Sequence, residues 1–162
     1  MKYTSVIKMV LTALLMTVFI NSNAQTSASV ESTVDEIVKK HEASKGVSCM
    51  KVVKGGGLEL VKMMLKKEFG KDFMKGVTCI KVINYSEASE ETCVTLRKDL
   101  DALSSLMQEF NVSKEEEFSD NNYVRCFASA TESDTLSDFV IALENDESKM
   151  IMYMAGKIVF KE

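Results

Sequence analysis

The segment KGVSCMKVVK at residues 45–54 recurs as KGVTCIKVIN at residues 75–84, with six of ten positions identical and the others conservatively changed. Both copies are rich in β-branched residues and follow a glycine, a composition typical of strands. The sequence therefore predicts two related strands, Val47–Val53 and Val77–Ile83. If they are neighbours, they form the centre of the fold.

The residues between the two copies have a helical period. Apolar residues recur at helical spacing in the segment 57–69, with lysines on another face; the apolar positions are Leu58, Val61, Met64, Leu65 and Phe69. Strand, helix and similar strand predict a βαβ unit with parallel strands and a right-handed crossover. Alternatively, the two copies are not neighbours and only reflect an old duplication.

Helical patterns also flank the repeat. Thr33 and Glu36 match a capping box, which predicts a short amphipathic helix over Thr33–Ala43. After the acidic turn Glu90-Glu91, apolar residues spaced three and four apart predict a longer core-packing helix. Its seam is Cys93, Leu96, Leu100, Leu103, Met107 and Phe110.

The last third of the chain changes to a period of two. Alternating segments separated by turn-forming residues predict an antiparallel meander; they are Tyr123–Ala130, Leu136–Leu143, Met150–Met154 and a short segment Ile158–Phe160. The expected fold class is α+β. It comprises two layers, a mixed β-sheet built from the βαβ unit followed by the meander, and helices mainly on one face.

The N-terminus has the features of an export signal. Lys2 and Lys8 precede an uncharged run at residues 9–20, and small residues follow it. That run is shorter than the roughly 20 apolar residues that cross a bilayer. We therefore expect a signal peptide at residues 1–24, a single α+β domain at residues 25–162, and a periplasmic or secreted protein.

Composition and charge limit the functions that the chain can perform. The 162 residues are 46% hydrophobic and 27% charged, which indicates a folded rather than a disordered chain. A single histidine excludes a multi-histidine metal site, and no nucleotide-loop, metalloprotease or hydrolase motif occurs, so we expect no metal and no cofactor. The net charge of −4 is unevenly distributed, because residues 45–81 are strongly basic and residues 86–148 strongly acidic.

The exported leader, the doubled strand segment, the helix at 57–69 and the following FGKDFM at 69–74 together resemble a family of small exported Gram-negative proteins, the domain of unknown function 4252 family. The resemblance covers most of the chain after the leader. It implies a protein of the bacterial envelope and supplies no active-site residues.

The four cysteines raise the question of disulfides. If the repeat strands pair directly, Cys49 and Cys79 occupy equivalent positions on one face, within reach of a disulfide. The alternative is that the thiols, including Cys93 and Cys126, are free and mostly buried. No CxxC motif supports a thioredoxin-type role.

The segment Lys54-Gly55-Gly56-Gly57 joins the first repeat strand to a helix. Consecutive glycines let backbone N–H groups approach an anion, and a helix N-terminus adds partial positive charge. This stretch is therefore a candidate anion-binding loop. A plain flexible turn is the alternative reading.

The lysines that follow form a candidate basic patch, comprising Lys62, Lys66, Lys67 and Lys71. Such a patch suits anionic lipid headgroups or polyanions, which would give a peripheral membrane contact. A solvated helix face is the alternative. Because the patch contains no arginine and the protein is expected to be exported, the patch does not indicate a nucleic-acid partner.

The sequence thus favours a non-catalytic binding or interaction module of the bacterial envelope, with an envelope protein or an anionic ligand as partner. Two other classes remain open. One is an enzyme with a dispersed acidic site that includes residues such as Glu132, Asp134 or Asp138. The other is a thiol- or metal-handling protein, in which the cysteines would cluster. The oligomeric state is left open.

Overall fold

A computed structural model describes residues 27–53, 55–110, 123–132 and 134–159. The expected signal peptide and its boundary with the mature domain, between residues 24 and 25, fall outside these ranges. The elements, in chain order, are α2 (Ser27–His41), β1 (Ser48–Val52), α3 (Gly56–Phe69), α4 (Lys71–Lys75), β2 (Val77–Asn84), α5 (Glu90–Asp99), the 3₁₀ helix η1 (Leu100–Ser105), β3 (Gln108–Phe110), β4 (Tyr123–Glu132), β5 (Thr135–Glu144) and β6 (Lys149–Val159).

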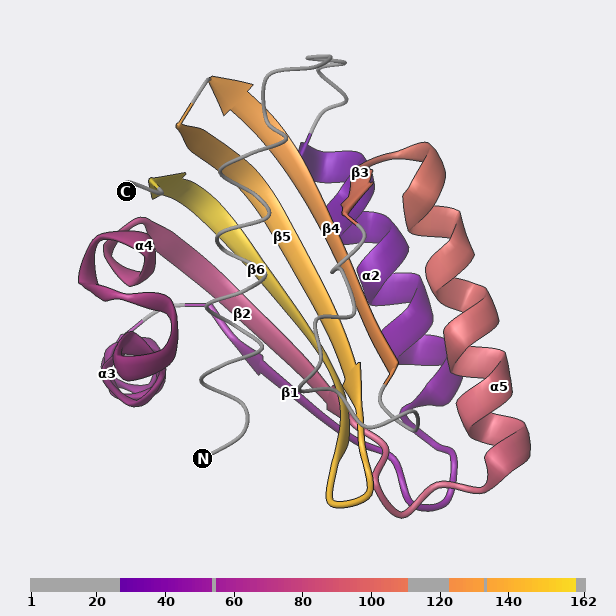
Figure 1. The fold of residues 1–162 in the computed structure, drawn as a ribbon. Coiled ribbons are helices and arrows are strands. Elements are labelled where there is room, and N and C mark those ends of the chain that lie inside the picture. Colours follow the sequence, from indigo (N-terminus) through magenta and orange to yellow (C-terminus); the bar gives the residue numbers. More distant parts are fainter. Residues whose placement is uncertain (1–26, 54, 111–122, 133, 160–162) are drawn as a thin grey trace, which may run out of the picture.

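The strands of the described residues form one six-stranded sheet in the order β1-β2-β6-β5-β4-β3 (Figure 1). Every neighbouring pair is antiparallel. This confirms the α+β class and the meander, which comprises β4, β5 and β6. The separate segment expected at its end is not a further strand, because β6 continues without a break to Val159.

The parallel βαβ unit expected from the repeat is wrong in direction, and the sheet is therefore not mixed. β1 and β2 do lie side by side, but they are antiparallel, with Val52 at the end of β1 opposite Ile80 near the start of β2. After α3 the chain turns at Gly70 into α4, so the two helices together return it to the end of the sheet that it left. A parallel pair needs a crossover that carries the chain back along the whole sheet.

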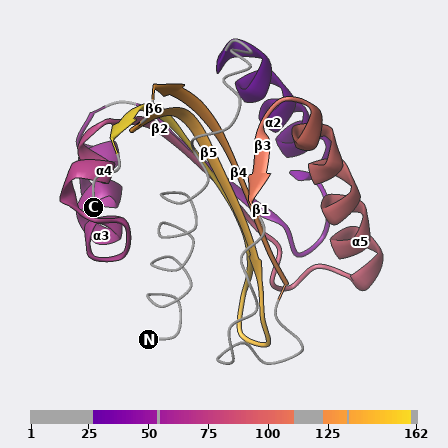
Figure 2. The same cartoon turned by 45° about the horizontal axis from the view of Figure 1, so that its top comes forward.

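The helices pack on both faces of the sheet, not mainly on one (Figure 2). On one face α3 and α4 contribute Leu58, Phe69 and Phe73 to a core with the strands. On the other face, residues of α2 and α5 such as Val34 and Leu96 pack against the opposite side chains of the same strands. Since successive residues of a strand point to opposite faces, both faces of the central strands are apolar and each needs a helical cover.

Two expected helices differ from those observed. α2 begins at Ser27, so Thr33 lies inside the helix and does not cap it. The long seam after Glu90 is helical only to Asp99, continues as η1 to Ser105, and ends in β3, which contains Phe110. All six seam residues are buried nevertheless, so the core prediction is confirmed where the helix prediction is not.

Candidate functional site: the outer surface of α3

Helix α3 carries two apolar stripes on opposite sides. The inner stripe holds the helix on the sheet: Leu58 and Phe69 are buried, and Val61 and Leu65 pack partly buried against the same core. The outer stripe consists of Leu60, Met63 and Met64, which are 55%, 65% and 68% exposed. The spacing i, i+3, i+4 places these three side chains together on one helix face. Met64, expected on the buried side, is therefore on the exposed one.

The inner stripe fixes the orientation of α3. The ring of Phe69 stacks on that of Phe73 in α4, with centroids 5.3 Å apart. Both rings meet the edge of Phe139 on β5, at centroid distances of 6.2 and 5.7 Å. Such aromatic pairs add about 0.5–1.5 kcal/mol each beyond the area that they bury. The helix is thus anchored, and its outer stripe faces outward because of that anchoring.

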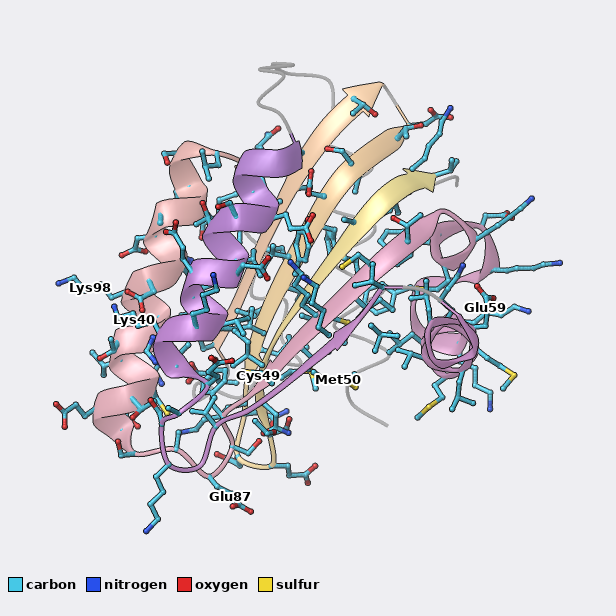
Figure 3. The ribbon with its side chains drawn as sticks, turned by 180° about the vertical axis from the view of Figure 1, so that it is seen from behind. Lys40, Cys49, Met50, Glu59, Glu87 and Lys98 are labelled. Atoms are coloured by element: carbon cyan, nitrogen blue, oxygen red, sulfur yellow. The ribbon has the colours of Figure 1, made fainter. Side chains whose placement is uncertain are left out.

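The lysines of the predicted patch lie next to this stripe, on α3 and at the start of α4. Lys66, Lys67 and Lys71 are exposed, whereas Lys62 donates hydrogen bonds to Glu59 at 3.2 Å and to the carbonyl of Lys75 at 3.4 Å. Lys67 follows Met63 and Met64 by four and three residues, so it extends the outer stripe. Figure 3 shows nitrogen-tipped side chains projecting outward from this part of the fold, with Glu59 on α3 labelled. Three lysines are therefore free to meet a ligand, and one supports the helix.

The glycine loop before α3 offers less than the sequence indicated. Lys54 lies outside the described residues. Gly55 precedes α3 with φ of 82°, and its carbonyl accepts hydrogen bonds from the N–H groups of Leu58 and Glu59. No atom lies within 4 Å of the position that a side chain would take at Gly55 or Gly56. Glu59 in the first turn adds negative charge, which opposes an anion. These features suit a plain turn, and anion binding stays an untested prediction.

The possible Cys49–Cys79 bridge is not formed, and the alternative of free, mostly buried thiols is confirmed: Cys79, Cys93 and Cys126 are buried and Cys49 is exposed. In the antiparallel register Cys49 lies opposite Ile83, four residues from Cys79. That offset separates the two positions by about 13 Å along the strands, well beyond disulfide range. The prediction failed because it assumed parallel strands, in which equivalent repeat positions lie opposite each other.

A buried lysine that the sequence analysis missed connects α2 to the sheet. The side chain of Lys81 on β2 is 2% exposed, and its Nζ lies 2.7 Å from Asp35 and 2.8 Å from Glu31, both on α2. It also lies 5.3 Å from the ring centroid of Tyr153. Burial alone lowers the pKa of Lys81, but the hydrogen bonds to the two carboxylates outweigh it and hold the pKa above the ordinary value of 10.5.

This ion pair predicts how stability depends on pH. Burial raises the pKa of Asp35, but its hydrogen bond to Lys81 and the positive charges of the nearby lysines together outweigh burial and lower the pKa below 3.8. The contribution of Asp35 to stability is therefore lost as pH falls through the folded value. The Lys81 contribution is complete below pH 10.5 and is lost as pH rises through the folded pKa.

We therefore expect the free energy of unfolding to be highest between about pH 5 and 10, measured as urea midpoints from pH 2 to 12. The variant Lys81→Met should reduce the alkaline fall. Lys98→Met, on the exposed side of α5, is the matched control and should leave it unchanged. An equal alkaline fall in both variants would contradict this role of Lys81.

The residues proposed for the alternative functions do not gather into a site within the described ranges. Asp138 is buried and accepts hydrogen bonds from Tyr153 and Ser137, each at 2.7 Å. Asp134 is exposed, and the side chain of Glu132 falls outside the description. Among the described residues, no three histidine, cysteine or acidic side chains are placed to share a metal ion. Asp138 is therefore part of the core.

The comparisons with known proteins add no assignment, since no family model, no curated protein and no solved structure matches this chain. In the part of the chain that the structure describes, no helix has the length and apolar character needed to span a bilayer.

Proposed function

We infer that this protein is an exported, non-catalytic binding module of the bacterial envelope, and that it attaches to anionic lipid surfaces through the outer stripe of α3. The observation that supports this is the exposure of Leu60, Met63 and Met64 on a helix anchored by its opposite face. An apolar stripe bordered by lysines is typical of helices that lie at a membrane interface. Export and a bacterial source rest on the leader-like N-terminus and the family resemblance.

Charge favours lipid over a second copy of the same face. Lys67 continues the apolar stripe, and Lys66 and Lys71 are exposed nearby. If two such faces met, their lysines would oppose each other, which is unfavourable. Anionic headgroups supply the opposite charge, and the acyl region below them accepts the apolar side chains. A basic, apolar face therefore fits an anionic bilayer surface better than it fits itself.

The expected binding is reversible. Each lysine near an anionic surface contributes about 1 kcal/mol, and each buried methylene about 0.8 kcal/mol. Three lysines and three partly inserted side chains provide only a modest total after the cost of association. Because a large share of it is electrostatic, the binding should weaken as salt is added.

Vesicle co-sedimentation tests the proposal, with the protein expressed with its own N-terminal segment. We expect binding to vesicles of phosphatidylglycerol mixed with phosphatidylcholine, little binding to phosphatidylcholine alone, and a loss of at least tenfold in affinity between 50 and 500 mM salt. Equal binding to both vesicle types would contradict the role of charge.

Variants of the outer stripe test which surface binds. Leu60→Ser, Met63→Ser and Met64→Ser combined should weaken vesicle binding at least tenfold while the urea midpoint changes little, because all three side chains are exposed. Val94→Ser on α5 is the matched control, since Val94 is 52% exposed and lies on the opposite side of the sheet. Unchanged binding by the triple variant would rule out this face, and the proposed function with it.

A further inference from the structure

The two copies of the repeat occupy different places in the sheet. β2 lies in the interior and pairs with β1 on one side and β6 on the other. β1 has a similar sequence but is an edge strand, and among the described strands it pairs only with β2. Its side chains are exposed or half-buried, and Cys49 and Met50 are labelled on it in Figure 3. The sequence of an interior strand thus recurs at the edge of the sheet, where outward N–H and C=O groups have no partner among the described strands.

The contact between β1 and β2 is the repeat paired with itself. Lys51 lies opposite Lys81, the residue that corresponds to it in the other copy. Met50 opposite Val82 and Val52 opposite Ile80 are the same pairing with the copies exchanged. The pair therefore has an approximate two-fold symmetry about its two lysines. The β1–β2 contact shows that one copy of the repeat pairs antiparallel with the other, closely similar copy.

We propose that the open edge of β1 pairs antiparallel with β1 of a second copy, with Lys51 opposite its equivalent, so that two sheets join into one. We assign a second copy of the chain to this edge because the two copies of the repeat already pair in this way within one chain, as β1 and β2. The dimer goes beyond the proposed membrane role and does not depend on it. The two-fold axis is perpendicular to the sheet, so the same face of each sheet lies on the same side.

Two exposed apolar residues fit this arrangement, one within β1 and one directly after it. Met50 is 44% exposed and Val53 is 39% exposed. In the proposed register, Met50 lies opposite Val52 of the second copy and Val53 opposite its Cys49. Because residues opposite each other point to the same face, each exposed side chain gains a cross-strand neighbour. The pairing would thus cover two of the large exposed apolar residues on the described surface.

The fold accommodates the two features that would oppose this pairing, the repulsion between the lysines and the space that the helices need. Lysines opposite each other repel, but Lys51 lies 3.7 Å from Asp35 and 4.0 Å from Glu31, so each copy brings its own acids. The helices also need room. α3 packs over β2, and the two β2 strands would be about 14 Å apart, which exceeds the helix diameter of roughly 10 Å.

Sedimentation velocity over a range of concentrations tests whether the dimer exists, and Met50→Lys tests its edge. We expect a dimer that dissociates on dilution, and at least a tenfold weaker association for Met50→Lys. Val94→Lys, at a similarly exposed position on α5, should associate as the unmodified chain does. A monomer at every concentration, or a dimer that Met50→Lys leaves unchanged, would overturn the proposal.

Cross-linking tests the register and does not depend on the charged variant. In Val53→Cys, the new thiol should lie opposite Cys49 of the second copy and form a covalent dimer on mild oxidation. Within one chain the two positions are about 13 Å apart along the strand, too far to react. Val94→Cys is the control and should give no such dimer. Equal cross-linking in both variants, or none in Val53→Cys, would contradict the proposed pairing. Vesicle binding by the outer stripe is measured separately and can succeed or fail independently.

Discussion

Replacing Gly76 with alanine is expected to destabilise the protein by at least about 3 kcal/mol, because the new methyl group would meet main chain. A Cβ at Gly76 would lie 1.7 Å from the carbonyl oxygen of Lys157 on β6. Gly76 has φ of −79°, so backbone strain is not the cause. The close approach lies beside a register shift between β2 and β6, where Gly156 pairs with Val77. The strands cannot separate there without disturbing the sheet.

Two further glycines separate steric clash from backbone conformation. Gly156 has φ of +144°, and a Cβ there would lie 2.1 Å from the carbonyl oxygen of Gly76, so Gly156→Ala combines both costs. Gly70 has φ of +88° and ψ of 159°, which side chains rarely adopt, but no atom within 4 Å, so Gly70→Ala should cost about 1–3 kcal/mol from backbone strain alone. Urea unfolding followed by circular dichroism should rank Gly156→Ala first and Gly76→Ala above Gly70→Ala. A cost at Gly76 no larger than that at Gly70 would show that β2 and β6 do not approach as described.

The sequence predicts the positions of the strands better than their directions. The period of two located β4 and β5 to within two residues at each end, and the repeat located β1 and β2. Direction depends on the connection between β1 and β2. The pattern over residues 57–69 predicts a helix, but not the five-residue α4 that turns the chain back. Periodicity reports which residues share a face, not where the next element leads.

The sequence pattern did not identify the exposed stripe of α3 for a related reason. The helix is apolar on two opposite sides, so helical spacing alone cannot say which side meets the sheet. The structure shows that Phe69 decides it, because its ring joins Phe73 and Phe139. The available signal was the pair Leu60 and Met63, which fit the helical period but not the inner stripe.

The buried Lys81 had no usable local signal. It lies between Cys79 and Ile83 on the face of β2 that packs toward α2, although a lysine in a sequence ordinarily indicates a solvent-exposed position. Its partners Glu31 and Asp35 lie 50 and 46 residues earlier in the chain. Charge pairing across such a distance follows from tertiary packing, which is why only the structure identifies it.

A second large effect is expected at Arg97 on α5, whose partner Glu144 on β5 is only 5% exposed. The guanidinium binds both carboxylate oxygens through Nε and Nη2, and Tyr85 donates a third hydrogen bond at 2.9 Å. The hydrogen bonds to Glu144 keep the pKa of Arg97 above its ordinary value despite partial burial. Removing the arginine would leave the buried carboxylate of Glu144 with the neutral Tyr85 hydroxyl as a donor. Among the described residues, no other cation forms an ion pair with Glu144.

Arg125 on β4 provides a matched comparison. Both arginines lie over an aromatic ring, Arg97 over Tyr123 at 5.5 Å and Arg125 over Phe127 at 4.9 Å. The carboxylate that Arg125 binds, Glu109 at 2.6 Å, is 31% exposed and can be hydrated when the arginine is lost. Each arginine also binds a second, exposed acid, Glu90 for Arg97 and Asp101 for Arg125, so the two sites differ chiefly in the burial of the main acid. We expect Arg97→Ala to cost about 3 kcal/mol and Arg125→Ala about 1 kcal/mol in urea unfolding.

The double variant Arg97→Ala with Glu144→Gln separates loss of packing from the unpaired charge. Glutamine keeps an acceptor oxygen for Tyr85 but carries no charge, so the double variant should recover much of the stability lost in Arg97→Ala. If burial of the charge is the main cost, the second substitution is stabilising in the Arg97→Ala background and destabilising in the unmodified chain. If it destabilises both backgrounds equally, the loss at Arg97 comes from packing on Tyr123 instead, and Glu144 tolerates its position without the guanidinium.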